Sequence, residues 1–187
     1  MIAGWLQTAL IDGEIESEEE DYPGSWTTLT LYLDNGEAVV EIEKYAEQDE
    51  TLRDAIQDTV RMLLDDKNPV KPTSAVKWLC QFMSRVKVLY VFRPMQAINT
   101  EAGWELFNEV WTNLRETLHG IVHLDEEGFT NEHGAQITWE YPGDETGDLK
   151  VAVLNEKGQE WIEYTLNLAN HEHRELFIAG KVPDKTK

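Results

Sequence analysis

The stretch VKVLYVFRP at residues 86–94 decides the fold, and a helical pattern follows it from about Thr100 to His119. Apolar side chains occupy both alternating faces of this stretch: Val86, Val88, Tyr90 and Phe92 on one, and Leu89 and Val91 on the other. A strand that is covered on both sides has this composition, whereas a half-exposed strand alternates apolar and polar residues. The sequence therefore predicts a central, doubly covered strand.

The helical segment that follows carries one apolar stripe in which aromatic residues dominate. Its members recur at helical spacing: Trp104, Phe107, Trp111, Leu114 and Leu118. A stripe at this spacing forms one face of an α-helix, and the polar residues between its members face solvent. We expect the stripe to pack against the strand as buried framework, and Gly120 to end the helix in the left-handed conformation.

Residues 26–43 predict a β-hairpin around Asn35-Gly36, because this dipeptide between two alternating runs is the strongest short-range hairpin signal. A two-residue turn there places the apolar residues of both strands on one face, in the pairs Leu33–Ala38, Leu31–Val40 and Leu29–Ile42. The register and the hydrophobic pattern therefore agree.

The rest of the chain predicts further helices at 49–66 and from Thr73 or Ser74 to about residue 86, then a β-meander from Ile121 onward. The meander comprises strands at 121–124, 128–130, 137–141, 149–154 and 161–168, and a helical turn follows near 173–179. We expect an α+β fold: antiparallel sheets built from hairpins and a C-terminal β-meander, with about three to four helices packed on one side. The chain is interpreted as a single domain, 1–187, with pseudo-symmetric halves 1–85 and 86–187 as an open alternative.

The charge balance restricts the partners of the protein. The chain has 187 residues, of which 36 are acidic and 16 basic, for a net charge of −20. Nucleic acids and anionic membranes repel such a chain, so neither is expected as a partner. No apolar run approaches the ~18 residues of a membrane span, and neither a secretory signal nor a cysteine framework accompanies the single Cys80. These features predict a cytoplasmic protein.

Motifs for catalysis or cofactor binding are absent from the sequence. There is no G-x-S-x-G and no glycine-rich phosphate loop, so no catalytic residue and no cofactor is predicted, and a non-enzymatic role is favoured. The candidate metal ligands are His171, His173 and Glu175, because alternate residues of an extended segment share a face. A catalytic metal usually takes three protein ligands.

Seven carboxylates crowd residues 12–21, and charges this dense keep a segment extended and solvated. Six of them are candidate partner-binding residues: Glu14, Glu16, Glu18, Glu19, Glu20 and Asp21. The leading hypothesis is a protein-binding module or inhibitor that presents a negative surface to a protein partner, with a basic partner as one version. The alternative is a small-molecule-binding protein or metal-dependent enzyme whose site assembles from scattered residues such as His123, His171, His173 and nearby carboxylates. Self-association as a homodimer is a third open alternative.

Overall fold

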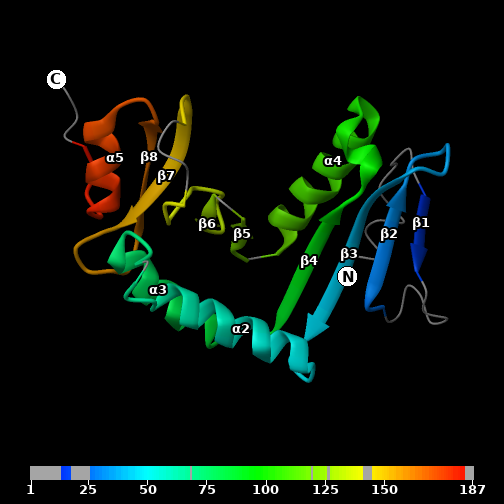
Figure 1. The fold of residues 1–187 in the computed structure, drawn as a ribbon, viewed down its shortest axis with the longest axis horizontal. Coiled ribbons are helices and arrows are strands. Elements are labelled where there is room, and N and C mark those ends of the chain that lie inside the picture. Colours follow the sequence, from blue (N-terminus) through cyan, green and yellow to red (C-terminus); the bar gives the residue numbers. More distant parts are fainter. Residues whose placement is uncertain are drawn as a thin grey trace. The chain divides into compact units, whose positions relative to one another are not determined.

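The computed structural model describes residues 14–17, 26–67, 69–118, 120–125, 127–140 and 145–183. The chain divides into two compact units, and each unit is built from two separate segments. Unit 1 comprises Met1–Arg53 and Val86–Leu118, and unit 2 comprises Asp54–Arg85 and His119–Lys187. Antiparallel sheets and four helices in the described residues confirm the α+β class (Figure 1). A single domain with related halves stays a prediction.

Unit 1 is a four-stranded antiparallel sheet with one helix on its face. The strands are β1 (Glu14–Ser17), β2 (Thr28–Tyr32), β3 (Ala38–Ala46) and β4 (Val88–Pro94), in the spatial order β1-β2-β3-β4. A short 3₁₀ helix, η1 (Gln96–Asn99), leads into α4 (Glu101–Thr117). The core lies between sheet and helix and is formed by Leu29, Leu31, Val40, Ile42, Leu106, Val110 and Leu114, among others.

The predicted hairpin exists, but its turn is one residue longer than predicted. Leu31 opposes Val40 and Leu29 opposes Ile42, as expected, whereas Ala38 opposes Tyr32 and not Leu33. The Gly36 amide donates to the Leu33 carbonyl at 2.8 Å, and the Leu33 amide donates to the Glu37 carbonyl at 3.0 Å. Gly36 has φ +81°. The loop is therefore a type I turn followed by a left-handed glycine, which shifts the register by one residue.

The prediction of a central, doubly covered strand at 86–94 is wrong. Within the described residues β4 pairs only with β3 and forms an edge of the sheet, and none of its residues is fully buried. Its apolar composition on both faces resembles that of a central strand, but α4 covers only the face that carries Tyr90 and Phe92. β2 and β3 are the strands with neighbours on both sides.

The buried stripe of α4 also differs from the predicted one. Gly103, Leu106, Val110 and Leu114 are buried, while Trp104 is 56% exposed and Phe107 and Trp111 are half-buried. The large rings therefore flank the contact with the sheet, because small and aliphatic side chains let the helix approach more closely. The helix ends at Thr117 with Leu118 in an extended conformation, and Gly120 does not adopt the left-handed conformation expected of it.

Unit 2 contains two small antiparallel sheets and helices of its own. Helix α2 (Glu50–Leu63) crosses the unit boundary and α3 (Thr73–Met83) follows it. The remaining elements are β5 (Val122–Leu124), β6 (Gly128–Thr130), β7 (Asp148–Leu154), β8 (Trp161–Asn167) and α5 (His171–Ile178). Val151 and Val153 of β7, Leu166 of β8 and Phe177 of α5 form its core. None of the helices in the described ranges is long and apolar enough to cross a membrane.

The predicted strand at 137–141 is absent over residues 137–140, and residue 141 lies outside the described residues. Residues 135–138 instead form a buried irregular segment. Isolated bridges at Gln136 join it to β6 and β7, and the Ile137 amide donates to the Phe129 carbonyl of β6 at 2.8 Å. Side chains replace the missing ladder: Thr138 Oγ1 accepts from the Phe129 amide at 2.7 Å, and Gln136 Nε2 donates to the Thr138 carbonyl at 3.1 Å. Buried polar groups need such partners.

Two buried threonine hydroxyls near β6 are expected to respond in opposite ways to replacement by valine. Thr138→Val leaves the buried Phe129 amide without its acceptor, which costs about 1–2 kcal/mol of unfolding free energy. Thr130 Oγ1 is buried without a hydrogen-bond partner among the described residues, so Thr130→Val is expected to be neutral or stabilising. Urea unfolding of both variants measures the difference, and equal losses would contradict this account of residues 135–138.

Candidate functional site

Four aromatic side chains, three from α4 and one from β4, lie together on the side of α4 that faces β4. We call Phe92, Trp104, Phe107 and Trp111 the aromatic flank. The Phe92 ring meets the Trp111 ring edge-on at 5.1 Å between centroids, and Phe107 stacks on Trp111 at 5.9 Å. Trp104 lies 5.8 Å from Phe107 and is the most exposed of the four. The flank is thus a continuous row of rings that begins at the sheet edge and ends in solvent.

The start of α4 is fixed by a tight contact with η1. Thr100 caps the helix, because its Oγ1 accepts from the Gly103 amide at 3.0 Å. A Cβ at Gly103 would lie 1.9 Å from the Ala97 carbonyl oxygen, so only glycine permits this approach. Ala97 O also accepts from the Thr100 amide at 3.0 Å and from Thr100 Oγ1 at 2.7 Å. This contact fixes the position of α4, and with it the position of the aromatic flank relative to β4.

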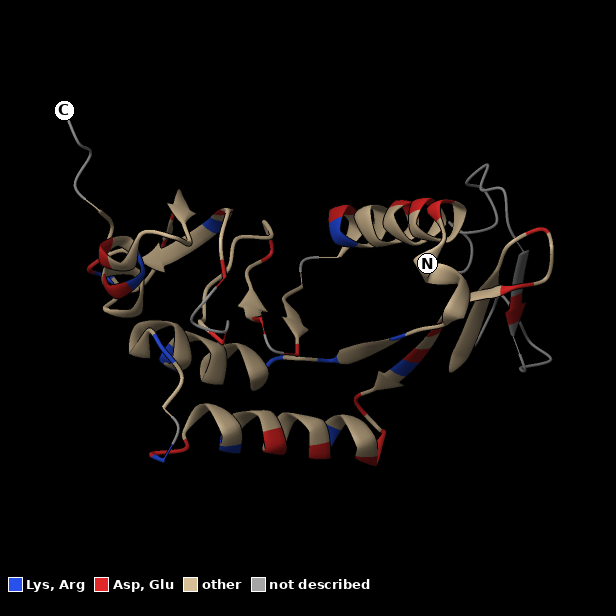
Figure 2. Ribbon diagram, turned by 45° about the horizontal axis from the view of Figure 1, so that its top comes forward, with Lys and Arg blue, Asp and Glu red and all other residues tan. Residues whose placement is uncertain are grey.

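An acidic stripe runs along the outer side of α4. It consists of the exposed Glu101, Glu105, Glu109 and Glu116, which lie on the side away from the sheet (Figure 2). Arg115 is the only basic residue of the helix, so α4 carries four acids and one base, a net −3. Helix α2 has a similar row of acids, Glu50, Asp54 and Asp58, but Arg53 and Arg61 leave it at −1. The acidic stripe is therefore the less compensated of the two.

The face of β4 opposite α4 holds a separate ion-pair network. Arg93 Nη2 donates to Glu43 Oε2 at 2.8 Å, and its Nε lies 3.7 Å from Glu41 Oε1. The Tyr45 hydroxyl donates to the same Glu43 oxygen at 3.0 Å. The hydrogen bond from Arg93 lowers the pKa of Glu43, and the hydrogen bond to Glu43 raises the pKa of Tyr45. Arg93 is thus engaged by carboxylates of its own sheet and does not neutralise the acidic stripe.

The acidic segment predicted as a solvated loop is in part a strand. Glu14 and Glu16 lie in β1, opposite Tyr32 and Thr30 of β2, and Glu16 is exposed. The other candidate partner-binding residues, Glu18, Glu19, Glu20 and Asp21, lie outside the described residues. Glu14 and Glu16 therefore belong to the same sheet as the aromatic flank, at the edge opposite β4.

The three predicted metal ligands lie on α5 and not on an extended segment. The helix begins at His171, capped by Asn170, whose side chain accepts from the His173 amide at 3.1 Å. Residues two apart on a helix point about 200° away from each other. His171 Nε2 lies 3.9 Å from Glu175 Oε1, whereas His173 faces another side. No group of three or more potential ligands able to hold a metal ion occurs among the described residues. Metal binding by His171, His173 and Glu175 stays a prediction.

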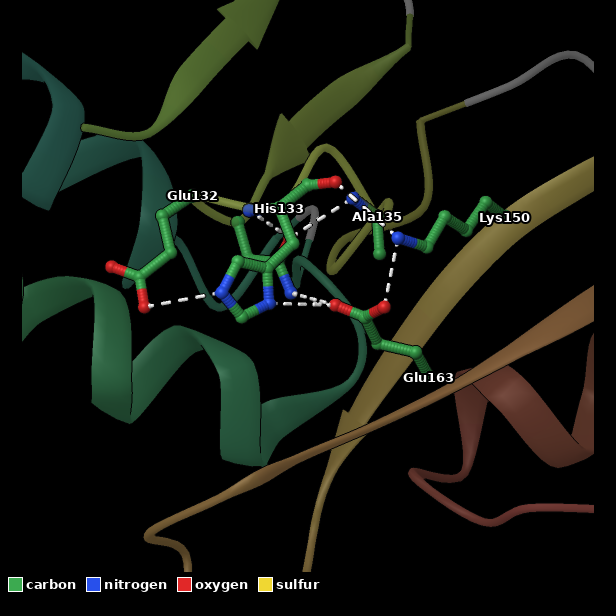
Figure 3. A network of polar contacts seen from close by, with 6 residues as sticks. Glu132, His133, Ala135, Lys150 and Glu163 are labelled. Carbon is green, nitrogen blue, oxygen red and sulfur yellow. Dashed lines mark hydrogen bonds and ion pairs between the residues drawn. The ribbon is translucent and has the colours of Figure 1, made fainter. Parts of the chain in front are cut away.

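A polar network in unit 2 was missed by sequence reasoning. His133 Nδ1 contacts Glu163 Oε1 at 2.9 Å, and Lys150 Nζ contacts Glu163 Oε2 at 2.8 Å (Figure 3). Glu132 Oε1 lies 3.8 Å from the other ring nitrogen of His133. The turn at 131–134 is recognisable from its asparagine and glycine, but Glu163 lies thirty residues further on. The network ties this turn to the β7–β8 hairpin.

Glu163 is expected to stabilise the fold near neutral pH and not in acid. The hydrogen bond from Lys150 lowers the pKa of Glu163 below its ordinary 4.5. A lowered pKa in the folded state gives stability that is present above the unfolded pKa and is lost as the pH falls through the folded one. Glu163→Gln should cost up to about 1 kcal/mol near pH 7 and less below about pH 4. Urea unfolding at both pH values, with Glu156→Gln as an exposed control, checks this, and a pH-independent cost would contradict it.

An open cleft of about 570 Å³ lies in unit 2 between the start of α3 and the end of α5. Its lining includes the positively charged Lys71, the hydroxyls of Thr73 and Ser74, and the negatively charged Glu156 and Glu175. Charges of both signs are spread around its rim, and they converge on no single point that would define a ligand.

No protein-family model, curated protein or solved structure matches this chain.

Proposed function

We propose that the protein is a protein-binding module that presents an acidic surface of unit 1 to a basic partner. The observation that carries this proposal is the juxtaposition on α4 of the acidic stripe with the partly exposed aromatic flank. The docking surface consists of the acidic stripe, the aromatic flank and the edge of β4. Because the exposed Glu101 and Glu105 are close to Trp104 on the helix, a cationic side chain that approaches the ring also meets negative charge.

Aromatic rings and carboxylates recognise the same kind of partner side chain in different ways. A Lys or Arg group binds the face of an indole ring through its quadrupole, and carboxylates attract it from a longer distance and set the association rate. The chain already uses the first interaction internally, since Lys44 Nζ lies 4.5 Å from the centroid of the Trp26 ring. Trp104 offers an exposed ring for the same purpose. Basic residues of a partner are therefore the natural complement of this surface.

The net charge of −20 acts in the same direction over a longer range. It draws a basic partner toward the molecule and opposes the approach of a second copy, nucleic acid or an anionic membrane. A cytoplasmic location, the absence of nucleic-acid partners and the possibility of a homodimer stay predictions. The rival hypothesis of a metal-dependent enzyme or small-molecule binder also stays a prediction, and metal analysis of the purified protein tests its first form.

Removing charge from α4 is expected to weaken binding of a basic probe more than removing the same charge from α2. The variant Glu101→Gln/Glu105→Gln/Glu109→Gln should bind a fluorescent, flexible Lys-rich peptide at least about threefold more weakly, since each exposed ion pair contributes about 0.2–1 kcal/mol. The matched control is Glu50→Gln/Asp54→Asn/Asp58→Asn, which has the same spacing and the same loss of three charges. Fluorescence anisotropy at low and high salt measures both.

The control variant should retain most of the affinity, because only general steering is reduced. Binding of the unmodified protein should also fall with added salt, which screens exposed charges. Equal losses in the two variants would show that net charge alone attracts the peptide, and the α4 surface would then have no specific role. No binding of the peptide at low salt would overturn the proposed function itself.

A further inference from the structure

Among the described residues, β3 alone pairs with β4, so the outer edge of β4 is open over five residues. Proteins usually guard sheet edges with charges, prolines, bulges or very short strands. Lys87, which pairs with Glu47, precedes the strand, and Arg93 and Pro94 end it. The strand residues between Lys87 and Arg93 are all apolar or aromatic: Val88, Leu89, Tyr90, Val91 and Phe92. Val88 is 40% exposed. An apolar edge of this length is a template for another strand.

The hydrogen-bond pattern shows which backbone groups of β4 face outward. The Met95 amide donates to the Val39 carbonyl at 2.9 Å, and bonded and non-bonded pairs alternate along an antiparallel ladder. The pairs Leu89–Tyr45, Val91–Glu43 and Arg93–Glu41 are therefore the bonded ones. On the other side of β3, the Lys44 amide donates to the Thr27 carbonyl at 2.7 Å, as this alternation requires. The outward N–H and C=O groups belong to Val88, Tyr90 and Phe92.

Pro94 occupies the next outward position, where a proline removes no bond to β3. It also ends the row of outward donors, so an added strand has three residues of β4 to pair with. The residues of such a strand that exchange hydrogen bonds with Tyr90 and Phe92 lie directly opposite them. Directly opposite residues share a face of the sheet. Their side chains would therefore lie on the α4 face, beside the aromatic flank.

We propose that the partner binds as an extended basic segment that adds a fifth strand to the unit 1 sheet at β4, an inference that rests on the proposed function. Lys or Arg residues at alternate positions pair with Tyr90 and Phe92. Their side chains lie beside the aromatic flank, and the acidic stripe on the outer side of α4 attracts them from a longer distance. The residues between them lie on the other face, over Leu89 and Val91, and are apolar. Backbone bonds thus supply affinity, and side chains at every second position supply specificity.

Charge decides between this occupant and a second copy of the chain. Pairing of β4 with β4 of another copy would bring two acidic stripes, each on a helix of net −3, toward one another. Each helix carries a single cation, Arg115, against four acids, so neither supplies the row of positive charges that the stripe attracts. A basic segment both pairs with the backbone groups of the β4 edge and neutralises the charge of the acidic stripe. A second copy would pair with the edge but would not neutralise the stripe. The observations therefore favour a basic partner.

The test uses peptides with identical side chains and different backbones. A short fluorescent peptide of alternating Arg and Val is compared with two versions, one N-methylated at the Arg residues and one N-methylated at the Val residues. Arg methylation removes the donors that pair with β4 and should weaken binding about tenfold, as expected for the loss of two backbone bonds. Val methylation removes donors that point away from β4 and should change affinity less than about twofold.

A protein variant gives an independent arm. Val88→Pro removes an outward donor of β4 and should weaken binding of the unmethylated peptide several-fold, whereas Val88→Ala keeps that donor and should not. Equal affinities of the three peptides, with binding still weakened in Glu101→Gln/Glu105→Gln/Glu109→Gln, would overturn strand addition and leave the proposed function standing. Self-association of the wild-type protein that Val88→Pro abolishes would overturn the proposal in favour of pairing between two copies.

Discussion

Gly103→Ala should destabilise the protein by about 3 kcal/mol, although alanine is normally the better helix residue by about 1 kcal/mol. The added Cβ would lie 1.9 Å from the Ala97 oxygen and 2.7 Å from the Ala97 carbonyl carbon. The Ala97 carbonyl is not free to move, because it accepts hydrogen bonds from the amide and the hydroxyl of Thr100. Relief of the clash therefore breaks these bonds or lifts α4 from the sheet.

The control for this prediction is Gly120→Ala, because a Cβ at Gly120 meets nothing within 4 Å and its backbone is not left-handed. Urea unfolding followed by circular dichroism should show a large loss for Gly103→Ala and little change for Gly120→Ala. Unchanged or increased stability of Gly103→Ala would contradict the close seating of α4 on η1. The same variant should also weaken binding of the basic peptide, since the aromatic flank moves with the helix.

Phe177→Ala is expected to cost about 3–5 kcal/mol, the range for truncating a buried aromatic side chain. The Phe177 side chain is fully buried, and its ring lies 6.1 Å from the Trp139 ring. It fills the space between α5 and the β7–β8 hairpin, where Val151, Val153 and Leu166 surround it. The short helix α5 has eight residues, too few to be stable without this contact. Loss of the ring should therefore release the helix from unit 2.

Glu172→Ala is the matched control, because Glu172 is an exposed residue of the same helix. We expect it to change the unfolding free energy by less than about 0.5 kcal/mol. Hydrogen exchange should show loss of amide protection in α5 for Phe177→Ala and not for the control. A cost below about 1 kcal/mol would mean that the site collapses around the missing ring.

Local patterns predicted the elements that depend on neighbouring residues in the sequence. The pairs Leu31–Val40 and Leu29–Ile42 follow from alternation and one turn, and the turns at 131–134 and 155–158 place a glycine with positive φ fourth, as their asparagine and glycine predict. The error at Leu33 arose because a type I turn with a left-handed glycine uses one more residue than the turn usually associated with Asn-Gly.

Features that depend on distant residues could not be predicted in this way. Whether a strand is central or at an edge depends on which strands pair with it. The apolar residues of β4 do not indicate that, within the described part of the chain, β3 alone pairs with it. The predicted buried stripe of α4 is displaced by one residue from the observed one. The spacing of apolar residues does not show how closely Gly103 lets the helix approach η1 and the sheet. The acidic stripe lay in the predicted solvent-facing residues, but its neighbour, the aromatic flank, was expected to be buried.

The interleaving of the two units has a consequence for the growing chain on the ribosome. Ala46 and Val88 are paired neighbours, so the segment between them leaves and re-enters the sheet of unit 1 at one end. Unit 1 has all of its segments once Leu118 has been synthesised, whereas Asp54–Arg85 must wait for His119–Lys187. During that interval the apolar side of α3, with Val76 and Leu79, has no β7 to cover it. Translation thus exposes this side of α3 until β7, which ends at Leu154, has emerged.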